Sequence, residues 1–295
     1  MPELPEVETV RRGLAPAMEG CVFRAVEQRR RDLRFPFPEN FASRIMGTEL
    51  VSMKRRAKYL CGYLSSGEVL IMHLGMSGRF SIMWPDDGAP HRAGRFTHQV
   101  SHHAKHDHVM FEMSNGTRII YNDARRFGFM DIVRAQEIDL CKHFRSMGVE
   151  PLGCGLNAEY IAQRASGRSV DLKAFLLDQR IIAGLGNIYV CEVLHRAGLS
   201  PKRSAGCLAR SGGGPSARAK KLVPAIQDVL SEAIAAGGST LRDYAAADGA
   251  LGYFQHAFRV YGREGKTCTA RGCSGIIRRI LQAGRSTFYC GGCQN

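Results

Sequence analysis

The sequence predicts an α+β protein in which an N-terminal helix and an antiparallel β-sandwich precede a helical region that ends in a β-hairpin. Three observations predict this order. Strand-like alternation dominates residues 21–121, where Asn115-Gly116 is typical of a tight hairpin turn. Helical periodicity begins at Asn157. Two close pairs of cysteines then flank two further strand-like runs at the extreme C-terminus.

The composition narrows the class of protein. The chain has 295 residues, enough for about two domains of ~100–200 residues each. A hydrophobic fraction of 44% excludes a disordered chain, and no run of about 18 apolar residues could span a membrane. The N-terminal sequence Met-Pro-Glu-Leu-Pro-Glu lacks the apolar stretch of a secretory signal, so we expect a cytoplasmic protein. The net charge of +14 predicts a polyanionic partner, nucleic acid before a membrane surface.

The first half begins with a helix expected at residues 5–19. Val7, Val10, Leu14 and Met18 recur at helical spacing and give this helix one apolar face. The strand-like runs that follow are Cys21–Val26, Leu50–Ser52, Lys58–Leu64, Val69–Leu74, His108–Met113 and Thr117–Tyr121.

Helices dominate the second half. The expected ranges are 157–165, which Asn157 would cap, 171–182, a third from Asn187 to about Ala197, and 216–236. The glycine-rich segment before Asn187 is either a plain turn between helices or a phosphate-binding turn. In the second case its glycines admit a close approach, and the free N–H groups of the next helix attract an anion. The excess of basic residues in the second half favours the phosphate-binding interpretation.

The C-terminal cysteines have the spacing of a metal site. The pattern Cys268-x4-Cys273-x16-Cys290-x2-Cys293 can place four thiolates tetrahedrally around one structural Zn²⁺. Two disulfides or four free thiols are the alternatives, but a tail with so few apolar residues could hardly fold alone. The strand-like runs between the pairs predict a β-hairpin with Arg285 near its tip. The remaining cysteines are expected to be buried small hydrophobic residues: Cys21, Cys61, Cys141, Cys154, Cys191 and Cys207.

Pro2 is a candidate nucleophile. Removal of Met1 would leave a secondary amine that can attack a sugar C1′ and form an iminium, which permits β-elimination of a phosphate. The carboxylates of Glu3 and Glu6 could shuttle protons beside that amine. The alternative is that Pro2 only begins a helix, and with Met1 attached its nitrogen is an inert amide.

Several blocks of sequence resemble the formamidopyrimidine-DNA glycosylase family. They follow the family's order from residue 2 to residue 294, and the resemblance covers nearly the whole chain. The blocks are Met1–Leu14, Arg55–Leu60, His73–Arg79, Lys105–Val109, Asp123–Gly128, Leu176–Gln179, Gly184–Tyr189, Val260–Arg263, Gly284–Thr287 and the four C-terminal cysteines.

The resemblance implies a monomeric, bifunctional repair enzyme that acts on damaged double-stranded DNA bound in a basic cleft. Such an enzyme excises 8-oxoguanine and formamidopyrimidines and then cleaves the abasic strand by β,δ-elimination. It also implies three domains, namely a β-sandwich catalytic domain at 1–147, a helix-two-turn-helix domain at 148–262 and a zinc finger at 263–295.

The resemblance also implies roles for individual residues. Pro2 would form the Schiff base, Glu3 would help to open the sugar, and Lys58 and Arg285 would bind phosphate and assist the eliminations. Residues that fill the gap left by an extruded base would be Met76, Arg125 and Phe127. Residues that contact the DNA backbone would be His106, Arg168, Lys173 and Asn187. Thr240–Phe258 matches a mobile region that closes over the base. Without the resemblance, Met76 and Phe127 would be assigned to core packing, and Arg168 and Lys173 to solvated helix ends.

The sequence departs from the family pattern in three places. The first cysteine pair has x4 where x2 is usual, which leaves the zinc site possible but with altered geometry. The segment Trp84–Lys105 is longer than usual, rich in histidine and expected to be an exposed loop, and Gly212–Gly214 looks like a loosened linker. Two alternatives stay open: an endonuclease VIII-type enzyme that prefers oxidised pyrimidines, and a catalytically silent damaged-DNA-binding protein.

Overall fold

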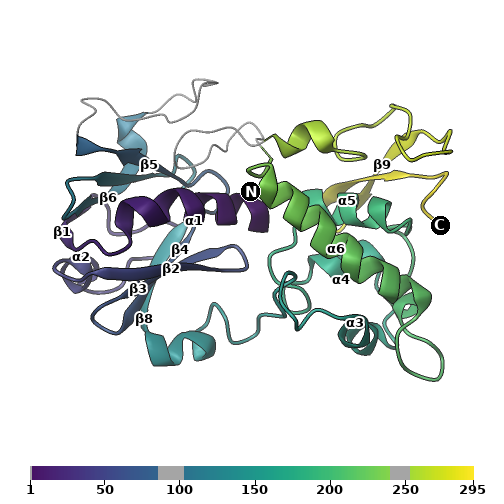
Figure 1. Cartoon of the computed structure of the whole chain (residues 1–295), viewed down its shortest axis with the longest axis horizontal. Coiled ribbons are helices and arrows are strands. Elements are labelled where there is room, and N and C mark those ends of the chain that lie inside the picture. The colour runs from purple at the N-terminus through teal and green to yellow at the C-terminus, as the bar shows by residue number, and fades with distance from the viewer. Residues whose placement is uncertain (1, 86–102, 240–252) are drawn as a thin grey trace. The chain divides into compact units, whose positions relative to one another are not determined.

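The computed structural model describes residues 2–85, 103–239 and 253–295, and its chain divides into two compact units (Figure 1). The first unit comprises residues 1–145 and 236–255, and the second comprises 146–235 and 256–295. The predicted division into three domains stays a prediction. In the described part of the chain, no helix is both long and apolar enough to cross a membrane.

Two four-stranded antiparallel sheets form the first unit, which confirms the predicted β-rich half. One sheet has the order β1-β6-β7-β5 and the other β2-β3-β4-β8. The strands of the first sheet are β1 (Phe23–Gln28), β5 (Arg79–Met83), β6 (Asp107–Met113) and β7 (Arg118–Asn122). Those of the second are β2 (Leu50–Arg56), β3 (Tyr59–Leu64), β4 (Glu68–His73) and β8 (Phe129–Arg134). Helix α1 (Leu4–Met18) packs on β2, and the short helix α2 (Phe41–Ile45) packs on β1.

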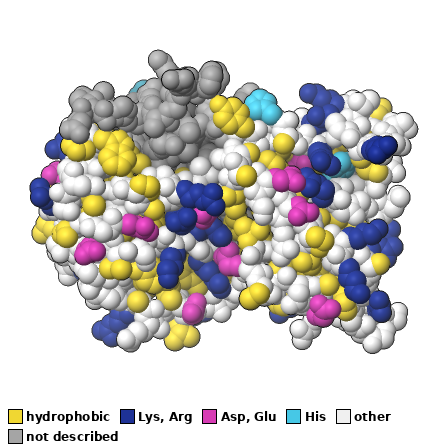
Figure 2. All heavy atoms as spheres, viewed as in Figure 1, with side chains coloured by type: hydrophobic (Ala, Val, Ile, Leu, Met, Phe, Trp, Pro, Cys, Tyr) yellow, Lys and Arg dark blue, Asp and Glu magenta, His cyan; other side chains and the backbone are white. Residues whose placement is uncertain are grey.

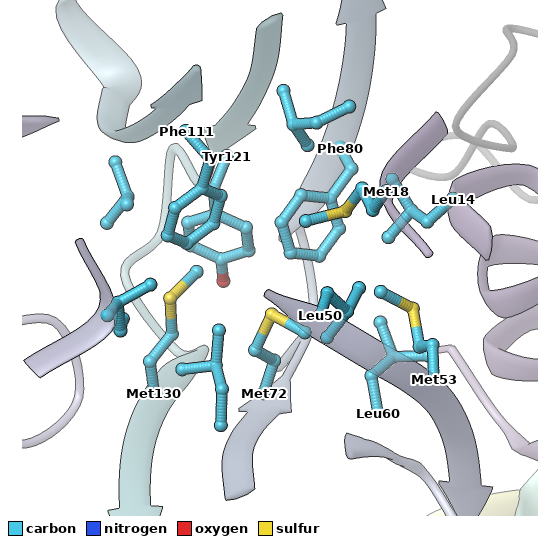
Figure 3. Packing of buried hydrophobic residues seen from close by; sticks show 14 of the residues in the cluster. Leu14, Met18, Leu50, Met53, Leu60, Met72, Phe80, Phe111, Tyr121 and Met130 are labelled. Atoms are coloured by element: carbon cyan, nitrogen blue, oxygen red, sulfur yellow. The ribbon is translucent and has the colours of Figure 1, made fainter. Parts of the chain in front are cut away.

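The space between the two sheets is filled by large apolar side chains (Figure 3). Phe80, Phe111 and Tyr121 come from one sheet and are at most 2% exposed. Residues of the other sheet and of α1 meet them: Leu14, Met18, Leu50, Met53, Leu60, Met72 and Met130. Replacing one such leucine with alanine costs about 2–5 kcal/mol, so this core fixes α1, and with it the chain's first residues, to the sandwich.

The second unit is built around α5 (Asn187–Arg196), which contacts α4, α6 and β10. Its other elements are α3 (Ala158–Ala165), α4 (Leu172–Leu177), α6 (Ala217–Ala235), β9 (Ile277–Gln282) and β10 (Arg285–Cys290). Asn157 caps α3 as predicted, because its side-chain oxygen accepts from the Tyr160 N–H at 2.8 Å. Short 3₁₀ turns complete both units at 104–106, 135–140, 205–208 and 254–257.

One expectation about an individual element was wrong, and two strands were missed. The helix expected at 171–182 ends at Leu177, because the Asp178 carboxylate accepts from the Arg180 N–H at 3.0 Å and Ile182 forms a parallel bridge with Val149. Strands β5 and β8 were not predicted. Both follow glycine-containing loops whose course depends on contacts between distant segments.

Candidate functional site

The first residues of the chain are buried and held by Glu6. Pro2 is buried and Glu3 is 4% exposed at the start of α1. The Glu3 N–H donates to Glu6 Oε2 at 2.8 Å. Glu6 Oε1 accepts from the N–H of Ser239 at 2.8 Å and from its hydroxyl at 2.9 Å. Glu6, considered above as a proton shuttle, therefore ties the N-terminal segment to the residue that precedes 240–252, a segment outside the described residues.

Lys58 lies in the two-residue turn between β2 and β3, which is tied to α1. Lys58 is 7% exposed, and Ala57 before it adopts a left-handed φ of 52°. The Arg55 guanidinium donates to the Ala57 carbonyl at 3.0 Å and lies 3.3 Å from the Glu8 carboxylate on α1. One ion pair thus links the helix that begins beside Pro2 to the turn that carries Lys58.

Asp123 joins the two loops that follow β4 and β7. Its carboxylate is fully buried and accepts from the Ser77 hydroxyl at 2.6 Å and from the Gly128 N–H at 2.8 Å. The Ser77 oxygen in turn accepts from the Arg125 N–H at 3.1 Å. The role of Asp123 was not predicted, because nothing in its local sequence shows that Ser77 and Gly128, which lie on different loops, both donate to its carboxylate.

Glycine permits the close approach of these loops. A Cβ atom at Gly75, whose φ is 61°, would lie 2.3 Å from the backbone N of Gly128. A Cβ at Gly128 would lie 1.9 Å from the Tyr121 hydroxyl. Neither separation is possible between real atoms, so both positions require glycine for space, and Gly75 also for conformation.

A cavity of about 520 Å³ lies beside these loops. Its lining combines cationic, apolar and imidazole groups from Leu33, Arg34, His73, Gly75, Met76, Arg125, Arg126 and Phe127. Phe127 is 43% exposed, and its ring centroid lies 4.7 Å from the Arg125 guanidinium carbon. Met76, Arg125 and Phe127 are therefore brought together at a surface cavity, and core packing does not account for the exposed Phe127.

His73 also lines this cavity, and no role was predicted for it from the sequence. Burial, and then the positive charges of Lys58 and Arg34, lower the pKa of His73 from 6.5 to about 4. Its Nδ1 accepts from the Gly75 N–H at 3.0 Å. The neutral ring therefore carries its proton on Nε2 and can act as a hydrogen-bond donor there.

The lowered pKa of His73 makes stability depend on pH in a defined window. Between pH 6.5 and about 4, His73 is protonated in the unfolded chain but neutral in the folded protein. Protonation therefore favours the unfolded state, and the free energy of unfolding decreases as the pH falls through this range. Asparagine does not titrate, but its side-chain oxygen can still accept from the Gly75 N–H. In His73→Asn, we therefore expect the free energy of unfolding to decrease less on acidification than in the wild type, by up to about 1.4 kcal/mol per pH unit. Urea unfolding of both proteins at pH 7 and pH 5 measures it. Equal losses in the two proteins would contradict the expectation.

His106 lies near the same loops, at the end of a 3₁₀ turn. It is half-buried, and partial desolvation, followed by the neighbouring charge of Lys105, lowers its pKa. Its carbonyl accepts from the Asp123 N–H at 3.0 Å. The other predicted histidine-rich positions between 86 and 102 lie outside the described residues.

In the second unit, Lys173 and Asn187 converge on strand β10 beside Arg285. Lys173 Nζ lies 3.2 Å from the Ser286 carbonyl and 2.5 Å from the Thr287 hydroxyl, and Asn187 Nδ2 donates to the same Ser286 carbonyl at 3.0 Å. Arg285 itself is exposed at the tip of the β9–β10 hairpin, as expected. The structure thus brings these three predicted residues together.

Their exposures differ, however. Lys173 is 0% exposed, and burial lowers its pKa. Its ammonium faces β10, so the interpretation of Lys173 as a solvated helix-end charge was wrong. Asn187 is half-buried at the first turn of α5, and its Oδ1 has no hydrogen-bonding partner among the described residues. Arg168 is exposed after α3, and its carbonyl accepts from the Ser204 hydroxyl at 2.8 Å.

The four C-terminal cysteines form a cluster that could hold a metal ion, since their sulfurs all lie within 4.8 Å of one another. Cys268 and Cys293 are separated by 3.8 Å between sulfurs, and Cys273 and Cys290 by 3.6 Å. A disulfide requires about 2.05 Å, whereas metal–sulfur bonds of about 2.3 Å in a tetrahedron put the sulfurs about 3.8 Å apart. Both separations fit the tetrahedron, and the x4 spacing does not prevent it.

Two glycines leave the space that this cluster occupies. A Cβ at Gly275 would lie 2.6 Å from the Cys290 sulfur, and one at Gly292 would lie 3.2 Å from the Cys273 sulfur. The N–H groups of the same two glycines point at sulfur, with N–S separations of 3.4 Å. Such donors stabilise thiolates, which is the protonation state that binds metal.

Two family models and several known proteins match this chain. A model described as the formamidopyrimidine-DNA glycosylase N-terminal domain matches residues 1–130, and one described as the formamidopyrimidine-DNA glycosylase H2TH domain matches residues 147–245. A formamidopyrimidine-DNA glycosylase of Methylobacterium sp. (strain 4-46) is 60% identical over 294 residues, covering 100% of this chain and 99% of the relative. The one from Sinorhizobium fredii is 55% identical over 298 residues, with 100% of both chains covered.

Solved structures are similar over the same length. The MutM (Fpg) protein of Thermus thermophilus has a TM-score of 0.81 at 35% identity, with 99% of this chain and 98% of that chain covered. Lactococcus lactis Fpg in complex with DNA that contains an abasic site has a TM-score of 0.83 at 30% identity, with 100% of both chains covered. A mutant of the same protein, in complex with DNA that contains Fapy-dG, has a TM-score of 0.83 at 31% identity and the same coverage.

Proposed function

The chain belongs to the formamidopyrimidine-DNA glycosylase family, and from this premise we propose how its residues divide the work of base excision and strand cleavage. It is a DNA glycosylase of a family that also carries AP lyase activity. We propose oxidised purines in double-stranded DNA as its substrates, the cytoplasm as its place of action and a monomer as its working form. The observation that carries the proposal is the buried Pro2-Glu3 segment at the start of α1, in the same unit as the Met76–Arg125–Phe127 cavity.

Pro2 acts as the nucleophile once Met1 is removed, because only the free amine has a lone pair to donate. The nitrogen attacks C1′ of the damaged nucleotide, and the bond from C1′ to the base breaks as the base leaves with a proton. Glu3, held by the Glu3–Glu6 hydrogen bond, supplies a proton to the ring oxygen as the sugar opens to the iminium. Loss of a proton from C2′ then expels the 3′ phosphate, and a second elimination expels the 5′ phosphate.

Cationic and neutral donors stabilise the departing phosphates. Lys58 and Arg285 supply positive charge, and His73 supplies a neutral Nε2–H donor that stays uncharged at physiological pH. Figure 2 shows Lys and Arg side chains gathered over the part of the first unit where α1 and β2 lie, which supports long-range attraction of a polyanion. Arg168 and Asn187 of the second unit contact the DNA backbone, and so does His106 of the first unit.

The base must leave the stack before it can react, at a cost of a few kcal/mol. Met76 and Phe127 would fill the gap, and Arg125 would hydrogen-bond the base left without its partner. The shared anchor of their two loops, Asp123, would keep the three side chains in one arrangement.

Zn²⁺ is the metal that we propose for the four-cysteine cluster. Four thiolates at tetrahedral separations are its usual structural ligands. When bound, the ion would link the segment before β9 to the end of β10 and the turn that follows it. It would so fix the strand that carries Arg285. Cys268, Cys273, Cys290 and Cys293 would hold it.

Borohydride trapping tests the enzymatic proposal. The purified protein is incubated with duplex DNA that carries 8-oxoguanine opposite cytosine, or thymine glycol, and the adduct is mapped by mass spectrometry. We expect an adduct at Pro2 that forms faster with 8-oxoguanine. Preference for thymine glycol would favour the endonuclease VIII-type alternative, and tight binding without an adduct would leave a silent binding protein.

Loss of one cysteine is expected to abolish DNA binding. Cys290→Ser removes a thiolate from the cluster, so the zinc content of the purified protein falls from one ion per chain towards zero and the Arg285 strand loses its support. Metal analysis and a filter-binding assay measure both effects. The control is Cys154→Ser, at a cysteine outside the cluster; its expected burial was wrong, because Cys154 is exposed. Normal DNA affinity in Cys290→Ser would refute the zinc assignment.

A further inference from the structure

An imidazole lies against the four-cysteine cluster without being one of its ligands. His195 occupies the last turn of α5 and is 5% exposed. Its Nε2 lies 3.3 Å from the sulfur of Cys268, which is itself buried. His195 is not part of the cluster of potential ligands. Among the described residues, that cluster consists of the four cysteines, whose sulfurs lie within 4.8 Å of one another.

The direction of this hydrogen bond follows from the chemistry of its two partners. A metal-bound thiolate carries no proton, so the ring must be the donor and the sulfur the acceptor. The other ring nitrogen, Nδ1, is buried and has no hydrogen-bonding partner among the described residues. Within the described residues, the Cys268 sulfur is therefore the only acceptor for a proton of the ring. The neutral ring accordingly carries its proton on Nε2.

Cys268 belongs to the more widely spaced of the two cysteine pairs. Its pair, Cys268-x4-Cys273, encloses a longer loop than Cys290-x2-Cys293, and a longer loop restrains its ends less strongly. Cys268 also accepts from the Ala270 N–H at 3.4 Å, much as Cys273 and Cys290 accept from glycine N–H groups. The imidazole is a side-chain donor added to this backbone pattern, and it comes from α5, a different element of the fold.

We propose that His195 is a positioning residue of the metal site, which donates its Nε2–H to the Cys268 thiolate and slows the loss of the metal. This proposal rests on the proposed zinc site. The donated hydrogen bond withdraws negative charge from one of four thiolates, and the buried surroundings strengthen it. It also joins the cluster to the helix whose first residue is Asn187, so that the metal site and the phosphate-binding turn share one rigid element.

Two variants separate the hydrogen bond from the volume of the ring. His195→Phe keeps an aromatic ring but removes the donor, whereas the amide N–H of His195→Gln can reach the position of Nε2. We expect His195→Phe to bind Zn²⁺ about 10–100-fold more weakly in competition with a chelator, and His195→Gln to recover most of the difference. The control is His143→Phe, which removes a buried imidazole that pairs with Asp131 in the first unit. It should leave zinc affinity unchanged.

Each outcome has a distinct meaning. Absence of zinc from the wild-type protein would refute the zinc site itself. One zinc per wild-type chain, with equal affinity in His195→Phe, would overturn only the role of His195. Because His195→Phe could fail to fold, ¹⁵N NMR of the zinc-loaded wild-type protein gives a second readout. We expect the His195 ring to be protonated on Nε2 with Nδ1 bare, and the opposite tautomer would overturn the proposal.

Discussion

Replacing Glu3 with glutamine is expected to slow excision of 8-oxoguanine by about 10²–10⁴-fold while DNA affinity changes little. The substitution keeps the shape of a side chain that is 4% exposed but removes the proton that we assign to sugar opening. The backbone N–H of residue 3 can still donate to Glu6, so α1 should begin at the same residue. Single-turnover kinetics on a duplex with 8-oxoguanine opposite cytosine measure the excision rate.

The matched control for this variant is Glu39→Gln, an exposed carboxylate in the first unit. It changes net charge equally and should retain the wild-type rate. On a duplex that already contains an abasic site, Glu3→Gln should retain more activity, because the abasic sugar already equilibrates with its open aldehyde form and needs less of the proton that we assign to ring opening. A wild-type excision rate in Glu3→Gln would show that Glu3 is not the acid.

Replacing Lys173 with methionine is expected to destabilise the protein by about 2–4 kcal/mol. Methionine fills a similar volume but leaves the Ser286 carbonyl and the Thr287 hydroxyl without the ammonium that they contact at 3.2 and 2.5 Å. Urea unfolding measures the loss. Arg285 begins the same strand, so strand cleavage should fall as well.

The salt dependence of DNA binding separates a structural lysine from one that contacts phosphate. Removing a phosphate contact lowers the slope of log K against log salt by about one. The exposed Arg168 should behave in that way in Arg168→Ala, with unchanged stability. Lys173→Met should show the reverse, with a wild-type slope and reduced stability. A stable Lys173→Met protein with a reduced slope would show that Lys173 contacts DNA directly.

Local signals explain what could be predicted from the sequence. The apolar face of α1, the Asn115-Gly116 turn, the cap of α3 and the spacing of four cysteines each lie within one short stretch of at most 26 residues, where periodicity, turn chemistry and ligand spacing can be recognised directly. The cysteine cluster was predictable in spite of its x4 pair, because a metal tolerates a range of loop lengths.

The residues that hold the site in place were not predictable, because their partners are remote in sequence. Glu6 binds Ser239, which is 233 residues away, and Asp123 accepts from Ser77, 46 residues away. Lys173 contacts residues more than 110 positions later, so from sequence it was indistinguishable from a solvated charge. The local spacing of the cysteines predicted the cluster that could hold a metal, but local sequence says little about which polar groups support a site.

The dependence of the N-terminus on Ser239 has a consequence during synthesis of the chain. Translation proceeds at about 5–20 residues per second, so Ser239 emerges on the order of 10–50 seconds after Glu6, which will later bind it. Until then the first unit lacks its returning segment, residues 236–255. An enzyme that removed Met1 during synthesis would therefore meet an N-terminus whose contacts with Ser239 have not yet formed. Removal of Met1, on which the proposed role of Pro2 depends, could then precede the contact between Glu6 and Ser239.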